Sequence, residues 1–113
     1  MTEDDIQISI LAWLRAVLPT ALIWSTPNSP RSKQTGARLK RLGMRAGVPD
    51  LCVLTDGRML FFEVKRPKQY ASPEQRTFME QAEECGARCA IVRSIDDVAL
   101  ALMHWQIRTR VAA

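Results

Sequence analysis

Hydrophobic and polar residues alternate with a period of two on both sides of the dipeptide Asp56-Gly57. Such alternation is typical of β-strands, and Asp-Gly is a strong signal for a two-residue hairpin turn. The pattern therefore predicts two antiparallel strands, at residues 48–54 and 59–65. In the second strand, Leu60, Phe62 and Val64 share the face predicted to lie on the core. The charged residues Glu63 and Lys65 lie on the opposite face.

Three segments carry apolar residues at helical spacing, and they are residues 2–19, 72–86 and 95–108. The first begins with Thr2 and Asp5 in the positions of a capping box, and acidic residues crowd its first turn. The second begins with Ser72, which precedes a proline, and Gln75 completes a capping box there. Each pair predicts where its helix starts.

Two further strands are predicted at residues 21–26 and 87–94. The last helix is capped by either Ser94 or Asp96. The long connection 27–47 is predicted to hold a short helical turn near residues 37–42. The order of elements is therefore α-β-β-β-α-β-α. It predicts an α/β fold with a mixed four-stranded sheet flanked by helices.

The chain has 113 residues and is 47% hydrophobic and 25% charged, which is typical of one soluble domain spanning residues 1–113. No apolar run is long enough to cross a bilayer, and the acidic N-terminus does not resemble a signal peptide. We expect a cytoplasmic protein. The three cysteines lack the spacing of a zinc site, so we expect buried, reduced thiols at Cys52, Cys85 and Cys89.

The net charge of +4 is concentrated in one segment. Between Pro27 and Gly47 there are basic residues and no acidic ones, whereas acidic residues outnumber basic ones in the rest of the chain. The basic residues of this segment are Arg31, Lys33, Arg38, Lys40, Arg41 and Arg45. A localised basic patch favours a polyanionic partner, most often nucleic acid, although a solvated loop is the simpler alternative.

The hairpin register places two carboxylates side by side. If Asp56 and Gly57 form the turn, Asp50 lies opposite Glu63, and Lys65 follows on the same face. Two unit charges roughly 5 Å apart repel by about 3 kcal/mol at an effective dielectric constant near 20. A divalent cation such as Mg²⁺ removes this conflict, because it prefers carboxylate oxygens. The alternative is a plain ion pair between Glu63 and Lys65, with Asp50 as a turn residue.

These motifs resemble a known family. The stretches VPD at residues 48–50, EVK at 63–65 and SPEQ at 72–75 are similar to the virus-type replication-repair nuclease (VRR-NUC) domains of the PD-(D/E)xK nuclease superfamily. TEDDIQ near the N-terminus and GARCAIVRS at residues 86–94 extend the likeness over nearly the whole chain. The tripeptide Val-Arg-Arg that marks many members is Val-Arg-Ser in this chain, at residues 92–94. The resemblance implies a restriction-endonuclease-like core.

The resemblance also implies roles for particular residues. Asp50 and Glu63 would bind the metal together with the backbone carbonyl of Val64, and Lys65 would be the catalytic lysine. Family members also have a glutamate on the first helix and a glutamine at the start of a later one. Glu3 and Gln75 match these positions, but helix capping explains each of them equally simply.

From these observations we expect a DNA endonuclease that depends on Mg²⁺, with Mn²⁺ as a substitute. The family resemblance implies a homodimer that resolves branched DNA such as Holliday junctions, in a bacterial or phage-infected cytoplasm. Leu102 and Trp105 of the last helix are candidate interface residues as well as core residues. Trp24 is more simply read as a core residue, but it could stack on an exposed base, and Tyr70 is a weaker candidate for a substrate contact. The alternatives are a flap- or end-directed nuclease, an RNA-directed nuclease, and a non-catalytic DNA-binding module with the same fold.

Overall fold

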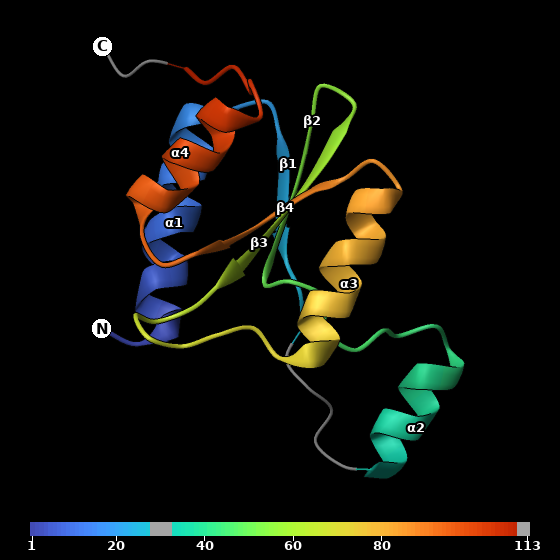
Figure 1. Ribbon diagram of the computed structural model, residues 1–113. Coiled ribbons are helices and arrows are strands. Elements are labelled where there is room, and N and C mark those ends of the chain that lie inside the picture. Colours follow the sequence, from blue (N-terminus) through green and yellow to red (C-terminus); the bar gives the residue numbers. More distant parts are fainter. Residues whose placement is uncertain (28–32, 111–113) are drawn as a thin grey trace.

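The computed structural model describes residues 1–27 and 33–110 as a sheet with helices on both faces (Figure 1). In chain order the elements are α1 (Glu3–Val17), β1 (Leu22–Ser25), α2 (Lys33–Arg41), β2 (Leu51–Thr55), β3 (Arg58–Val64), α3 (Pro73–Glu84), β4 (Arg88–Val92) and α4 (Ile95–His104). The predicted elements are confirmed. One difference is α2, a helix of 9 residues where the sequence predicted only a short turn.

The sheet is mixed, as predicted, with the strand order β1-β2-β3-β4. The pairs β1–β2 and β2–β3 are antiparallel, and β4 runs parallel to β3. The hairpin register is also confirmed, because Thr55 lies opposite Arg58 and Leu51 opposite Phe62. Asp56 and Gly57 both have positive φ angles, 49° and 72°, which is the backbone conformation of a tight hairpin turn.

The two faces of the sheet are covered differently. Helices α1 and α4 lie together on one face, whereas α3 lies on the other (Figure 1). Leu60, Phe62 and Val64 of β3 are fully buried in the core with residues of α1 and α4. Phe61 points to the other face and packs edge-to-face on Phe78 of α3, with ring centroids 5.3 Å apart. Glu63, two residues after Phe61, lies on this α3 face.

The capping residues start the helices where the sequence predicted. Both capping boxes form, at the beginnings of α1 and α3. Ser94 is the cap of α4, which decides between the two candidates, because its side chain accepts a hydrogen bond from the backbone N–H of Asp97. These bonds occupy backbone donors that a helix leaves free in its first turn.

The expectation that all three cysteines are buried is wrong, and the structure decides between the two roles expected of Leu102. All three cysteines are free thiols, but Cys85 is exposed, since it directly follows α3 on its solvent side, and Cys89 is only partly buried. Leu102 is 1% exposed, so it belongs to the core and is not an interface residue. Trp105 packs on Phe62 of the core, with ring centroids 5.6 Å apart. No helix in the described part of the chain is long and apolar enough to cross a membrane.

Candidate active site

Asp50 lies directly before β2, where two segments of backbone hold it. The backbone N–H of Thr26 donates to the carbonyl of Asp50 (2.9 Å), and the Thr26 hydroxyl donates to the carbonyl of Pro49 (2.6 Å). Across the hairpin, the backbone N–H of Val64 donates to Oδ2 of Asp50 (2.7 Å). The carboxylate of Asp50 therefore has a fixed direction at the end of the β2–β3 ladder.

Glu63 is buried, with only 1% of its surface exposed. Its Oε2 accepts a hydrogen bond from Nε2 of Gln75 (3.0 Å) and lies 3.3 Å from Nζ of Lys65. Its Oε1 is buried and has no hydrogen-bond partner among the described residues. Asp50 is also close enough for its charge to act on Glu63. The structure thus brings together the three residues that the hairpin register predicted to be neighbours.

Burial, followed by the neighbouring charge of Asp50, raises the pKa of Glu63 from its ordinary value of 4.5 to about 8. Lys65 opposes this shift. Near neutral pH, the protonated form of Glu63 is therefore favoured in the metal-free protein. This proton relieves the like-charge repulsion that the sequence predicted for the pair. The repulsion between Asp50 and Glu63 returns only when Glu63 loses this proton.

Gln75 combines the two roles that the sequence left open. Its Oε1 accepts from the backbone N–H of Ser72 (2.8 Å), which completes the capping box of α3. Its Nε2 donates to Glu63 at the same time. A side-chain amide has both an acceptor and donors, so one residue can cap the helix and hold the buried carboxylate.

Glu3 is the predicted site residue that the structure does not join to this cluster. It occupies the first turn of α1, where the helix dipole favours a carboxylate. Within residues 1–27 and 33–110, no three His, Cys, Asp or Glu side chains are grouped so that they could hold a metal ion. A role for Glu3 in metal binding therefore stays a prediction.

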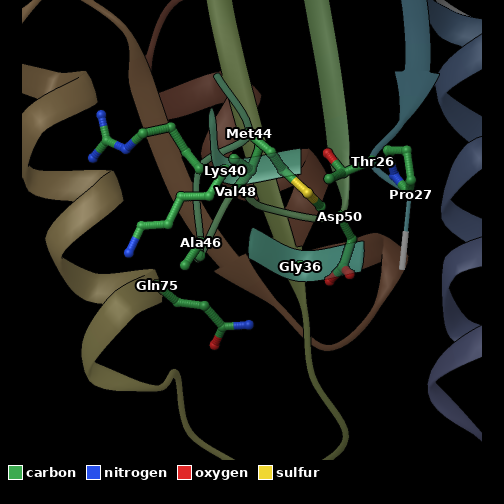
Figure 2. Close-up of a pocket in the computed structure, with 11 residues that line it drawn as sticks. Thr26, Pro27, Gly36, Lys40, Met44, Ala46, Val48, Asp50 and Gln75 are labelled. Carbon is green, nitrogen blue, oxygen red and sulfur yellow. The ribbon is translucent and has the colours of Figure 1, made fainter. Parts of the chain in front are cut away.

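A pocket of about 360 Å³ opens beside Asp50 (Figure 2). Its lining comes from the end of β1, from α2, from the segment 44–48 and from the first turn of α3, and it includes Thr26, Pro27, Lys40, Met44, Asp50 and Gln75. The basic segment thus reaches the carboxylate site, and Lys40 brings a positive charge to its edge. Sequence spacing alone did not predict this pocket.

Segment 44–48 is docked on α3 by two close contacts. Gly47 has a φ of +81°, and a Cβ atom there would lie 2.3 Å from the carbonyl oxygen of Glu74, so only glycine fits. The guanidinium of Arg45 donates to Oε1 of Gln81 (2.6 Å) and lies 5.6 Å from the ring centre of Phe78. Arg45, predicted to contact phosphate, is therefore also a bridge between this segment and α3.

The other predicted basic residues are only partly described. Arg38, Lys40 and Arg41 are exposed near the end of α2. Lys33 is the first residue of that helix, and Arg31 lies outside the described residues. Two exposed basic residues directly follow the site without having been predicted as part of it, and they are Arg66 and Lys68. Their signal was present in the stretch KRPK at residues 65–68.

Arg93, the first arginine of the family tripeptide, holds the loop between β3 and α3. Its guanidinium donates to the carbonyl of Gln69 (2.6 Å) and lies 5.9 Å from the ring centre of Tyr70. Ser94 replaces the second arginine and caps α4 instead. Tyr70 is 78% exposed and Trp24 is 46% exposed, so both rings are accessible for the predicted substrate contacts.

Comparisons with known proteins support the family resemblance that the sequence motifs suggested. A family model for the VRR-NUC domain matches residues 1–96. One solved structure, a VRR_NUC domain protein, superposes with a TM-score of 0.74 at 25% identity, covering 93% of this chain and 88% of that chain. A second, a VRR_NUC domain, shares the fold with a TM-score of 0.65 at 24% identity, covering 91% of this chain and 96% of that one. A search of curated proteins found no match.

The family match covers most of the chain and includes every residue of the carboxylate cluster. The mixed sheet, the fixed Asp50 and the buried Glu63 with its lysine agree with the pattern VPD…EVK that suggested the family. The chain therefore belongs to the virus-type replication-repair nuclease (VRR-NUC) domain family, and this membership indicates a nuclease.

Proposed function

We propose that this protein is a metal-dependent DNA endonuclease that hydrolyses phosphodiester bonds at the Asp50–Glu63 site. The observation that carries the proposal is the buried Oε1 of Glu63, which lies beside a second carboxylate and has no hydrogen-bond partner within residues 1–27 and 33–110. Leaving a buried polar group unsatisfied costs about 1–3 kcal/mol, and more for a charged one. Such an arrangement destabilises the fold, so it indicates a ligand that the two carboxylates bind together.

A hard divalent cation fits this donor set. Mg²⁺ is usually bound through one or two carboxylates and keeps several waters, and Mn²⁺ accepts the same oxygen ligands. Asp50, Glu63 and the backbone carbonyl of Val64 would hold the ion. When bound, such an ion supplies an activated water and stabilises charge on the phosphate. Ligands must be deprotonated, so Glu63 would give up its proton on binding.

The protein's own groups orient this chemistry. Val64 N–H fixes Asp50, and the amide of Gln75 fixes Glu63, so neither carboxylate has to reorganise when substrate binds. Lys65 has its Nζ 3.3 Å from Glu63, where it can donate to the attacking water or to a phosphate oxygen. The exposed basic side chains of α2 would contact neighbouring phosphates.

Branched DNA is the substrate class that we propose, because the family resemblance implies junction resolution by a homodimer. A second candidate is a flap- or end-directed nuclease. A non-catalytic DNA-binding module is disfavoured by the intact arrangement of Asp50, Glu63 and Lys65. These functions differ in which DNA structure is cut, so one panel of substrates separates them.

The test is cleavage of labelled four-way junctions, flaps, blunt duplexes and single strands of DNA, with matched RNA versions, in Mg²⁺, Mn²⁺ or chelator. We expect cleavage with either metal, none with chelator, and loss of cleavage in Asp50→Asn and Lys65→Ala. Asp56→Asn, in the hairpin turn, is the control, because asparagine accepts the positive φ of that position. Cleavage that persists in chelator or in Asp50→Asn would contradict the proposal, and binding without cleavage would favour the module.

A further inference from the structure

The pocket beside Asp50 has the size of a small-ligand site. Its volume of about 360 Å³ lies within the range of about 300–1,000 Å³ that is usual for such sites. A DNA duplex cannot enter this pocket, because the duplex is wider than its own major groove, which is about 12 Å wide. A single nucleotide displaced from the helix is the part of a DNA substrate that can enter it.

The walls of the pocket match the chemistry of a nucleobase. Pro27, Met44 and Val48 present apolar surface, which suits the flat faces of a base. The Thr26 hydroxyl donates its proton to the backbone and also contacts Sγ of Cys52, and its oxygen has a further lone pair that can accept from the edge of a base. Lys40 supplies a positive charge for the attached phosphate.

The floor of the pocket is part of the carboxylate site. Asp50 and Gln75 both line the pocket (Figure 2). The charge of Asp50 acts on Glu63, and the side-chain amide of Gln75 donates a hydrogen bond to it. A nucleotide in the pocket would therefore have its own phosphate next to the two carboxylates. The flexible side chain of Met44 can adapt to different bases, so this recognition would depend on DNA shape more than on sequence.

We propose that this pocket binds one unpaired nucleotide next to the phosphate that is cut. The inference rests on the proposed nuclease function and deepens it. It makes the enzyme selective for cut sites at which a nucleotide is free to leave the helix, such as branch points, flaps and bulges. Fully paired DNA would have to open before it could be cut.

The test uses duplexes with one unpaired 2-aminopurine, and matched duplexes in which that base is paired. Binding is measured in chelator, so that no cleavage occurs. Stacking in DNA quenches the fluorescence of 2-aminopurine, and the residues that line the pocket include no aromatic ring. We therefore expect a fluorescence increase on binding of the unpaired probe, and a much smaller one for the paired probe.

Two variants fill the pocket in different ways. Met44→Trp introduces a large ring, and Ala46→Leu narrows the opening, since both residues line the pocket. Each should abolish the fluorescence increase and slow the cleavage of bulged DNA in Mg²⁺ by about tenfold or more. Leu42→Trp is the matched control, because Leu42 is 69% exposed and does not line the pocket. Melting temperatures confirm that each variant is folded.

The outcomes separate this inference from the proposed function. If the enzyme cuts DNA with Mg²⁺ but neither pocket variant changes fluorescence or cleavage, the pocket inference is wrong and the nuclease proposal stands. If the wild type cuts no DNA, the nuclease proposal fails, and the fluorescence comparison still decides whether the pocket takes a nucleotide. An equal fluorescence increase with the paired probe would overturn the selectivity for unpaired nucleotides.

Discussion

Glu63 binds a proton more tightly in the folded chain, where its pKa is about 8, than in the unfolded chain, where the ordinary value is 4.5. Its contribution to stability is therefore complete below the unfolded pKa and is lost as the pH rises through the folded pKa. We expect the melting temperature of the metal-free protein to fall between about pH 5 and pH 8. Glu63→Gln should flatten this dependence, because a neutral amide needs no proton.

The measurement is a series of thermal melts in chelator from pH 5 to pH 9. Glu84→Gln, at the exposed end of α3, is the control for losing one carboxylate. Excess Mg²⁺ should stabilise the wild type more at pH 8 than at pH 6, because the metal competes with the proton of Glu63. If Glu63→Gln and Glu84→Gln had the same pH dependence, the proposed titration of Glu63 would be wrong.

The helix cap of α3 can also be separated by mutation from the contact of Gln75 with Glu63. Ser72→Ala removes the capping hydroxyl of α3 but leaves the amide of Gln75 beside Glu63, whereas Gln75→Ala removes both functions. Each variant should lose about 1 kcal/mol of stability, the usual contribution of a helix cap. Only Gln75→Ala should also lose cleavage, by about tenfold or more, because it frees the buried carboxylate.

Denaturant unfolding and initial cleavage rates, measured on the same preparations, test this pair of variants. Equal cleavage rates in the two variants would show that Gln75 is only a capping residue. Equal stability of the wild type and Ser72→Ala would show that the cap contributes little.

At the scale of elements, α2 is the part of the chain that we expect to contact the DNA backbone. Each phosphate contact on duplex DNA contributes about 0.9 to the slope of log K against log salt concentration. Lys40→Gln combined with Arg41→Gln should therefore lower this slope by up to roughly 2 and weaken binding to all DNA structures alike. The measurement is a salt titration of binding in chelator.

The control exchanges two exposed arginines outside α2. Arg15 lies near the end of α1, on the face of the sheet opposite α3, and Arg108 follows α4. The double variant Arg15→Gln, Arg108→Gln changes the net charge as much as the α2 variant does. A salt slope that falls equally in both variants would make α2 a solvated helix and not a DNA contact.

At the scale of the whole molecule, we expect a homodimer, because paired incision of a junction needs two sites and this chain carries one carboxylate cluster in its described part. Light scattering at low micromolar concentration should report twice the chain mass. The exposed apolar residues of α4 are Leu100, at 62%, and Met103, at 72%. Leu100→Glu with Met103→Glu should shift the protein to a monomer without unfolding it.

Leu102→Ala on the same helix is the contrasting variant. Because Leu102 is buried in the core, this change should cost about 2–5 kcal/mol of stability and leave the surface of α4 unchanged. A monomeric wild type that cuts both strands of a four-way junction symmetrically would contradict the expected dimer.

The sequence by itself determined the features that depend on neighbours along the chain. The Asp-Gly turn sets the hairpin register, which places Asp50 beside Glu63, and Thr2 and Ser72 start two helices where expected. Strand alternation also separates the core face of β3 from the face that carries Glu63. These features could be predicted because a helix cap joins residues three positions apart and a tight turn fixes the pairing of the two strands that it connects, so turn chemistry and periodicity are sufficient.

Only the tertiary structure decided how separate elements meet. Periodicity shows which face of a helix is apolar, but it does not show which element covers that face or how deeply. For this reason Cys85 was misjudged from the sequence, and the choice between core and interface for Leu102 and the contact of Gln75 with Glu63 were left open. The pocket beside Asp50 needs segment 44–48 docked on α3, and that depends on the close approach of Gly47 to a helix 27 residues further along the chain, at Glu74.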